Sequence, residues 1–421
     1  MFLKVIILVL YFFIISIYAG EENADEGQKE VGFYTSIEEA LKNSPKVSSL
    51  WLKNKNLKEF PNDILKLKRI DMLNLAGNFL RLLPEEIGEF NNLSDLDLSN
   101  NMLMELPNEI IALKKLKMLR LSGNSFKEFP EEILELSELE LLQLVSCNLR
   151  EIPEGIGKLT KLKVLWLSLN PLGELPKEIG SLKKLEDLHL VCIELKEIPK
   201  EIEELRNLKA INLAGNNIGL IPKEVFCLPN IEILNLSNNK INVIPEKMWN
   251  LKKLIMLNLR ENEIVMMPRM IGQLELLMYL NLSANNINKI PNDIGKLRRL
   301  EDLYFSKNNI KEIPKKISNI KELKRLILDH NRIKIIPKEI RGLMNLRLLD
   351  LSNNKIKDIP KEIGELEKLG TLLLQSNKIK KFPKEIEKLK GLKHLNLKSN
   401  DLSEKEKERI KKLLPSTEIE F

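Results

Sequence analysis

Residues that usually carry chemistry are scarce in this sequence. Among its 421 residues there are three cysteines and three histidines. The cysteines are Cys147, Cys192 and Cys227. Three scattered cysteines are too few for a disulfide framework. The sequence also has no glycine-rich phosphate loop and no nucleophile–base pair at a recognisable spacing. We therefore expect no enzymatic activity, no cofactor and no metal site.

An excess of one charge is lacking too. The chain has 67 lysines and arginines against 60 aspartates and glutamates, a formal net charge of +7. The two signs are interleaved over short distances, as in PKEIEKLK at 383–390, which is typical of a solvated helical face. A nucleic-acid-binding surface needs a stripe of positive charge, and the sequence shows none. We therefore expect no nucleic-acid partner.

Long hydrophobic runs are absent except at the start of the chain. Lys4 is followed by an apolar run at 5–18 and then by Ala19. A membrane-spanning helix needs about 20 apolar residues, whereas the hydrophobic part of a signal peptide needs about 7–15. Residues 1–19 are therefore predicted to be a cleaved signal peptide, and 20–34 a flexible lead-in. Because Ile17 is large for its place before the cleavage site, an uncleaved membrane anchor is the alternative, and only then would a membrane be a partner.

What the sequence does have is a unit of 23 residues, repeated without insertions. A proline recurs every 23 residues from Pro61 to Pro383, 15 times in all. The copy at 346–368 reads LRLLDLSNNKIKDIPKEIGELEK. One such unit cannot bury its own apolar side, so it needs copies of itself above and below.

Each part of the unit has its own pattern. Leu349 and Leu351 alternate as in a short strand, while Ile363 and Leu366 lie three apart after the proline, as on one face of a helical turn. The position of Asn354 is asparagine in 13 of 16 copies. The exceptions are Lys55, Cys147 and Ile193. An amide can satisfy backbone groups of the turns above and below it, so we expect a buried asparagine ladder.

The pattern LxxLxLxxNxIxxIPxxIxxL is the signature of a leucine-rich repeat. It predicts an α/β fold: a leucine-rich repeat solenoid, or horseshoe, with a concave parallel β-sheet and short helical or 3-10 segments on the convex side. The repeat array is expected at 47–400, with about 16 strand segments.

The two ends of the array are predicted to be covered. An N-terminal capping helix is expected at 35–46, begun by a capping box at Ser36–Glu39. A C-terminal cap of one helix and a short strand is expected at 401–421, with a second capping box at Ser403–Glu406. Repeat arrays need such caps for solubility.

These segments together resemble a known family. The capping segment SIEEALKNSPKV, repeats of the form NLxxIPKEIGxLxxL and the tail LSEKEKERIKKLLPSTEIEF are similar to the secreted leucine-rich repeat proteins of Leptospira. The resemblance covers the chain from about residue 33 to the end. It implies export to the cell surface or medium and adhesion to host proteins or matrix, and it brings no catalytic residues.

The sheet face offers two candidate binding regions. In most repeats the exposed strand residues are small or polar, such as Asn235 and Ser237, but repeats five to seven differ. There a tryptophan patch consists of Leu141, Gln143, Val145, Val164, Trp166, Leu169, Asp187, His189, Val191 and Cys192. A weaker tyrosine cluster consists of Tyr279, Asp302, Tyr304 and Arg325. A contiguous apolar patch with an exposed Trp166 predicts a protein contact. Drift of a structural repeat, or cover by the lead-in, would also fit the patch.

The sequence thus predicts an exported, non-enzymatic protein that binds another protein, such as a host surface or matrix protein, through its concave face. An envelope-tethered or periplasmic structural protein is the first alternative, and an intracellular signalling scaffold the second. A further hypothesis is a metal site at His330, which follows Asp329 and lies one repeat from Asp350. We interpret these three residues instead as ordinary polar residues of a variable surface.

Overall fold

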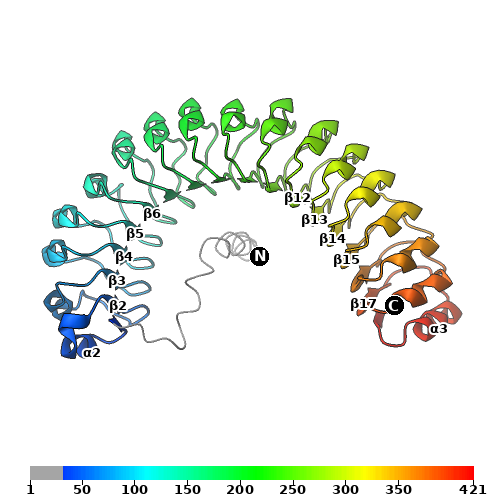
Figure 1. The fold of residues 1–421 in the computed structure, drawn as a ribbon, viewed down its shortest axis with the longest axis horizontal. Coiled ribbons are helices and arrows are strands. Elements are labelled where there is room, and N and C mark those ends of the chain that lie inside the picture. Colours follow the sequence, from blue (N-terminus) through cyan, green and yellow to red (C-terminus); the bar gives the residue numbers. More distant parts are fainter. Residues whose placement is uncertain (1–31) are drawn as a thin grey trace.

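The computed structural model describes residues 32–421, which form one horseshoe-shaped solenoid (Figure 1). Its β-strands line the inner, concave arc, and its short 3-10 helices line the outer, convex arc. The predicted architecture is therefore confirmed. The predicted signal peptide at 1–19 and the lead-in up to residue 31 lie outside the described residues.

Each repeat contributes one three-residue strand to a parallel sheet that has 18 strands within residues 32–421. The repeat strands are β2 (Ser49–Trp51), β3 (Met72–Asn74), β4 (Asp95–Asp97), β5 (Met118–Arg120), β6 (Leu141–Gln143), β7 (Val164–Trp166), β8 (Asp187–His189), β9 (Ala210–Asn212), β10 (Ile233–Asn235), β11 (Met256–Asn258), β12 (Tyr279–Asn281), β13 (Asp302–Tyr304), β14 (Arg325–Ile327), β15 (Leu348–Asp350), β16 (Thr371–Leu373) and β17 (His394–Asn396). The end strands are β1 (Phe33–Tyr34) and β18 (Glu418–Glu420).

The convex side is built from 3-10 helices. They are η1 (Ser44–Lys46), η2 (Asn62–Lys66), η3 (Glu85–Glu89), η4 (Asn108–Ala112), η5 (Glu131–Glu135), η6 (Glu154–Lys158), η7 (Lys177–Ser181), η8 (Lys200–Glu204), η9 (Lys223–Cys227), η10 (Glu246–Asn250), η11 (Arg269–Gln273), η12 (Asn292–Lys296), η13 (Lys315–Asn319), η14 (Lys338–Gly342), η15 (Lys361–Glu365) and η16 (Lys384–Lys388). In the array each follows the repeat proline, as η15 follows Pro360. Proline suits this place because its fixed φ is compatible with a helix start and its missing N–H is not needed there.

The 23-residue period sets the sheet register. Leu234 of β10 pairs with Leu257 of β11, and the same offset of 23 holds along the array. The apolar positions of the repeat therefore stack in columns, and Leu349, Leu351 and Ile363 are all fully buried. Replacing one such leucine by alanine would cost about 2–5 kcal/mol, because the rigid stack cannot collapse into the cavity.

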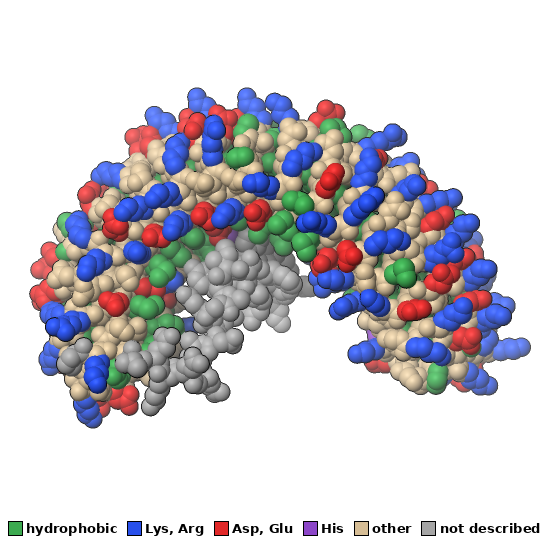
Figure 2. Space-filling view, viewed as in Figure 1, with side chains coloured by type: hydrophobic (Ala, Val, Ile, Leu, Met, Phe, Trp, Pro, Cys, Tyr) green, Lys and Arg blue, Asp and Glu red, His purple; other side chains and the backbone are tan. Residues whose placement is uncertain are grey.

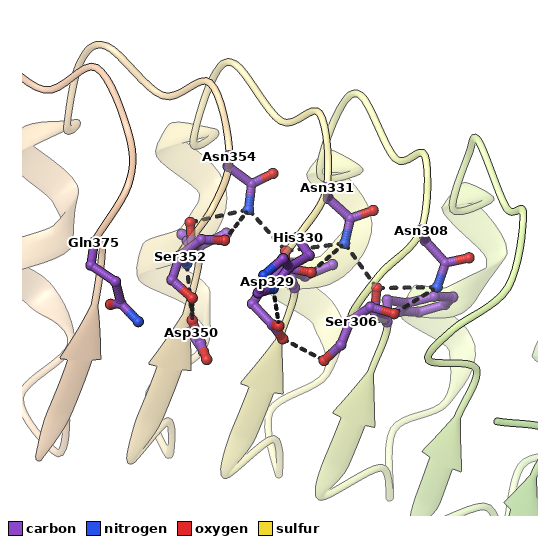
Figure 3. Close-up of polar contacts among 12 residues, drawn as sticks. Ser306, Asn308, Asp329, His330, Asn331, Asp350, Ser352, Asn354 and Gln375 are labelled. Carbon is purple, nitrogen blue, oxygen red and sulfur yellow. Dashed lines mark hydrogen bonds and ion pairs between the residues drawn. The ribbon is translucent and has the colours of Figure 1, made fainter. Parts of the chain in front are cut away.

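The predicted asparagine ladder is confirmed. Asn239 is buried, and its Nδ2 donates to the carbonyl oxygens of Leu213 at 3.0 Å and Leu236 at 3.1 Å. Its Oδ1 accepts the N–H of Ile218 at 3.1 Å. The amide thus joins its own turn to the preceding repeat. Figure 3 shows the equivalent residues Asn308, Asn331 and Asn354.

One residue of every repeat, just before the ladder position, has a left-handed backbone conformation. The residue preceding the ladder position has a positive φ in all 16 copies, for example +53° at Asn353. In the three repeats without a ladder asparagine, the residue after that position is left-handed as well. These residues are Asn56, Asn148 and Glu194. Where the ladder asparagine is missing, a second residue of the turn therefore adopts a left-handed conformation.

At Cys147 the neighbouring repeat compensates for the missing amide. The Oδ1 of Asn170 accepts two backbone N–H groups, from Cys147 at 2.9 Å and Leu149 at 3.0 Å. The Cys147 thiol donates to the carbonyl of Leu121 at 3.2 Å, as a ladder Nδ2 would. Burial raises the pKa of this thiol to about 11. Cys147 is therefore a small buried residue in the ladder rather than a reactive thiol.

The N-terminal end differs in two ways from the prediction. The helix α2 (Ile37–Lys42) lies inside the predicted cap, but the Ser36 side chain makes no capping hydrogen bond, so the first capping box was wrong. The strand β1 falls in the predicted flexible lead-in. Phe33 pairs with Ser49, and its ring lies 5.3 Å from that of Trp51, which explains why residues 33 and 34 are ordered as part of the sheet.

At the C-terminal end, half of the second capping box forms. The Ser403 Oγ accepts the N–H of Glu406 at 3.3 Å and begins helix α3 (Glu404–Leu413). The Glu406 carboxylate, however, accepts the N–H of Phe382 at 2.8 Å, so it fastens the cap to the last repeats. Ile410 is buried against that repeat. Within residues 32–421, no helix is long and apolar enough to cross a membrane.

Candidate protein-binding face

The last residue of each strand either supports the turn that follows it or carries a larger side chain on the concave face. In eight of the sixteen repeat strands it is Asn or Asp, and its Oδ1 accepts the N–H two residues later. Asn235 accepts from Ser237 at 3.1 Å in this way, and Asp350 from Ser352 at 2.9 Å (Figure 3). Such Asx turns carry the chain from the strand into the ladder. The expectation that Asn235 is an exposed polar residue was therefore wrong, since it is 1% exposed.

This Asx residue is missing in two runs of neighbouring strands. Strands β5 to β8 end in Arg120, Gln143, Trp166 and His189, and strands β13 and β14 end in Tyr304 and Ile327. Isolated exceptions are Trp51 and Leu373. The two runs overlap the tryptophan patch and the tyrosine cluster, although Arg120 and Ile327 are not members of either. There, large side chains have replaced a residue that supports the turn, which favours a role other than folding.

The tryptophan patch is centred on a stacked pair. Trp166 and His189 are register partners on β7 and β8, and their ring centroids lie 4.7 Å apart with nearly parallel planes. The Trp166 Nε1 donates to Asp187 Oδ2 at 3.2 Å, and His189 Nε2 lies 3.0 Å from Asp187 Oδ1. The indole N–H is thus satisfied inside the patch.

Most of the patch is buried, which corrects the prediction of an exposed tryptophan. Trp166 is 9% exposed. Other buried members are Leu141, Gln143, Asp187, His189 and Val191. The half-buried members are Val145, Val164, Leu169 and Cys192. The physical reason is cross-strand cover: strands about 4.8 Å apart bring large side chains of neighbouring repeats into mutual contact.

Two members of the patch occupy the left-handed turn position. Leu169 has a φ of +59° and Cys192 a φ of +52°, where Gly77 and Gly215 stand in other repeats. A left-handed conformation costs a residue with a Cβ about 1–2 kcal/mol. Leucine at this place is therefore not explained by backbone preference.

The structure brings all four residues of the tyrosine cluster together. Tyr279, Asp302 and Arg325 lie in one row across β12, β13 and β14, because the register pairs them directly. Arg325 forms an ion pair with Asp302 and donates from Nε to the Tyr304 hydroxyl at 3.1 Å. The rings of Tyr279 and Tyr304 have centroids 5.3 Å apart and are tilted by 43°.

Burial sets the protonation of this cluster. It raises the pKa of Tyr279 to about 12, and it raises the pKa of Tyr304 as well. Both phenols, which are protonated at neutral pH even at their ordinary pKa, therefore stay protonated at higher pH as well. The Tyr304 hydroxyl already accepts from Arg325, so its own hydrogen can be donated to a bound group.

Asp302 has an acceptor that nothing in the cluster uses. The residue is 8% exposed, and burial raises the pKa of its carboxyl while the hydrogen bond from Arg325 opposes that rise. One oxygen, Oδ2, faces Arg325, but the buried Oδ1 has no hydrogen-bond partner. A buried acceptor without a donor costs about 1–3 kcal/mol. A donor supplied by a bound molecule would remove that cost.

A third polar group surrounds His330 and Asp329, the residues of the alternative metal hypothesis (Figure 3). Asp329 accepts from the Ser306 hydroxyl through one oxygen, and its other oxygen lies 2.8 Å from His330 Nδ1. Because the carboxylate stands between hydroxyl and imidazole, Ser306 and His330 are not arranged as nucleophile and base. Asp350 bonds to Ser352 instead of joining them.

The rest of the visible surface carries mixed charge. Figure 2 shows lysine and arginine side chains intermingled with aspartate and glutamate over the face in view. Many of these charges form exposed pairs between repeats, such as Lys158 with Glu135 and Lys209 with Glu186. Such pairs contribute little to stability, about 0–1 kcal/mol each, and present no field of one sign to a polyanion.

Comparisons with known proteins agree with the fold. The chain matches a model described as leucine-rich repeat region at 87–170, 269–344 and 334–414, and a second model described as leucine rich repeat at 206–264. No curated protein matches the chain. Among solved structures, a leucine-rich repeat protein of Leptospira interrogans is 39% identical with a TM-score of 0.76, and the match covers 94% of this chain and 100% of that one.

Two further structures show how widely the fold is used. The plant peptide hormone receptor RGFR1, solved in complex with RGF2, is 31% identical with a TM-score of 0.70 over 85% of this chain and 64% of the receptor chain. The internalin InlF of Listeria monocytogenes is 25% identical with a TM-score of 0.65 over 72% of this chain and 86% of the internalin. This chain belongs to the leucine-rich repeat proteins, whose fold is typical of protein–protein interaction.

Proposed function

We propose that this chain is an exported, non-enzymatic leucine-rich repeat protein that binds another protein through its concave face, in adhesion or host interaction. The observation that carries the proposal is the tyrosine cluster. Arg325 bonds to the Tyr304 hydroxyl and to one oxygen of Asp302, Tyr279 is the register neighbour of Asp302, and the other Asp302 oxygen is buried without a hydrogen-bond partner. Tyr and Arg are among the residues that most often dominate protein interfaces.

The partner should supply a hydrogen-bond donor to Asp302. Because this oxygen is buried, the Asp302 side chain has to turn toward the surface as the partner binds. A backbone amide, a lysine or an arginine of the partner would then satisfy it, while the faces of Tyr279 and Tyr304 would pack against the same group. The Arg325 side chain is 46% exposed and has further N–H groups for the partner's carbonyl or carboxylate oxygens.

The tryptophan patch is proposed as a second contact of the same partner. Strands β7 and β13 are six strand spacings apart, which corresponds to about 29 Å at 4.8 Å per strand. A standard interface covers about 800 Å² per partner, so one folded protein lying in the arc can reach both regions. The half-buried Val164 and Leu169 would be the patch residues that such a partner touches.

Export and surface location are supported by two observations. The sequence of residues 1–19 has the composition of a signal peptide. Similar structures include a Leptospira protein and a Listeria internalin, and a receptor solved in complex with RGF2 supports recognition of protein ligands by this fold. Mass spectrometry of the exported protein tests the cleavage: we expect a chain that begins near Gly20, and an intact Met1 would contradict it.

The binding proposal is tested with a matched pair of arginine variants. Arg325 and Arg341 belong to the same repeat, but Arg325 is on β14 and Arg341 is on η14 of the convex side. Immobilised wild type, Arg325→Ala and Arg341→Ala chains are exposed to cell-surface and matrix proteins, and captured proteins are identified by mass spectrometry. A partner retained by wild type and Arg341→Ala but lost with Arg325→Ala supports the concave face. A partner lost only with Arg341→Ala would contradict it.

A further inference from the structure

The last two strands of the sheet bring a histidine and two glutamates together. His394 begins β17, while Glu418 and Glu420 are the two ends of β18. The register pairs His394 with Glu418 and Asn396 with Glu420. Because residues two apart on a strand face the same side, both carboxylates and the imidazole share one face of the sheet. Ile419, between the glutamates, packs against the core instead.

The two carboxylates approach different nitrogens of the His394 ring, and an ion would take one of the two nitrogens. His394 Nδ1 lies 3.7 Å from Glu418 Oε2, and His394 Nε2 lies 3.3 Å from Glu420 Oε1. One ligand atom from each residue can be chosen so that all three lie within 4.8 Å of one another. Ligands about 2.0–2.1 Å from a tetrahedral zinc ion are separated by about 3.3 Å, so a small movement of the exposed Glu418 side chain would complete the set.

One glutamate is already held in place. Glu420 Oε2 is bonded to Lys398 Nζ at 2.6 Å and to Asn396 Nδ2 at 3.0 Å, which leaves Oε1 directed toward His394. Outer hydrogen bonds of this kind orient the ligands of metal sites. His330 offers a contrast within the chain, because its imidazole lies beside a single carboxylate, that of Asp329.

We propose that His394, Glu418 and Glu420 bind one divalent transition-metal ion of the zinc type. An imidazole nitrogen with carboxylate oxygens suits zinc, cobalt or nickel, whereas magnesium and calcium prefer oxygen ligands alone. The remaining positions of the ion face solvent, since Glu418 is 77% exposed, and would hold water or a ligand from outside. The ion would also tie the edge strand β18 to β17 and so close the open end of the sheet.

Calorimetric titration of the metal-stripped full chain with zinc chloride tests the site. We expect one ion per chain, and a weakening of at least about tenfold in His394→Ala, because even loss of an outer hydrogen bond to a metal ligand costs that much. His394→Cys keeps a ligand at the same place and should bind more tightly than His394→Ala. His330→Ala is the matched control and should bind as wild type does.

A second readout separates ligation from a structural effect of the substitutions. Zinc should slow amide hydrogen exchange in β18 of the wild type and of His394→Cys, but not of His394→Ala. Glu418→Gln removes a carboxylate from an exposed position and should weaken binding while the circular dichroism spectrum stays unchanged. Absence of saturable zinc binding, or equal affinity of wild type and His394→Ala, would overturn the proposal.

Discussion

The tryptophan patch and the tyrosine cluster occupy the same sheet, six strands apart, but they use their polar groups differently. In the patch, Trp166 stacks on His189 and its N–H bonds to Asp187. In the cluster, Asp302 keeps one buried oxygen without a donor, and the Arg325 side chain is about half exposed. The indole N–H of the patch thus bonds within the patch, whereas we propose that the cluster bonds to another molecule.

The backbone beneath the two regions differs as well. The ladder is interrupted beside the patch at Cys147 and Ile193, each followed by a second left-handed residue. Below the cluster it is continuous, with Asn285, Asn308 and Asn331 all in place. The large aromatic side chains of the patch thus coincide with an altered backbone, whereas those of the cluster stand on the regular ladder.

The largest expected effect is that of a substitution in the tryptophan patch on the free energy of unfolding. Trp166→Ala should lower the free energy of unfolding by about 3 kcal/mol, because a buried ring, its stack and its hydrogen bond are all lost. Tyr304→Ala should cost about 1 kcal/mol, since the tyrosine is only half-buried. Denaturant unfolding of both variants measures the difference. Equal losses would mean that the two regions do not differ in their contribution to folding.

A smaller effect is expected in the ladder. Asn239→Ala should cost about 1–3 kcal/mol, because four hydrogen bonds to the buried backbone lose their partner. Cys147→Ala should cost less than about 1 kcal/mol, because Asn170 already supports the backbone of that turn. Thermal and denaturant unfolding are the measurements. If Cys147→Ala is the more damaging change, the compensation by Asn170 is not sufficient.

The smallest effect concerns pH. Burial raises the pKa of Asp302 above its ordinary value of 3.8, so ionising this carboxyl is harder in the folded chain than in the unfolded one. Stability from this group is fully present below about pH 3.8 and falls as pH rises through the higher folded pKa. Asp302→Asn should remove this part of the pH dependence. Unfolding free energies at several pH values between about 3.5 and 7 measure it. A gap between variant and wild type that stays constant over that range would contradict the expectation.

Much of the fold could be predicted because its information is local and repeated. Each 23-residue copy carries the strand leucines, the ladder asparagine and the proline, and fifteen copies reinforce one register. The capping boxes were less predictable, because their outcome depends on contacts with the next element. Glu406 met the N–H of Phe382, and the Ser36 side chain made no cap.

The candidate site was predicted less completely, for an identifiable reason. Asn235 on the strand could be an exposed contact or the acceptor of an Asx turn, and the residue type fits both. The period did contain one overlooked signal: Trp166 and His189 are 23 residues apart, which places them side by side. The free oxygen of Asp302 depends on side-chain packing, which no spacing reveals.

Partner affinity, measured in parallel for Tyr304→Ala and Trp166→Ala, tests the central claim most directly. The partner is the protein that requires Arg325 in the capture experiment, and surface plasmon resonance supplies the dissociation constants. We expect Tyr304→Ala to weaken binding by about 30-fold, corresponding to about 2 kcal/mol at an interface centre, and Trp166→Ala to weaken it less while lowering the melting temperature. Wild-type affinity in Tyr304→Ala, together with a large loss in Trp166→Ala at unchanged stability, would contradict the account.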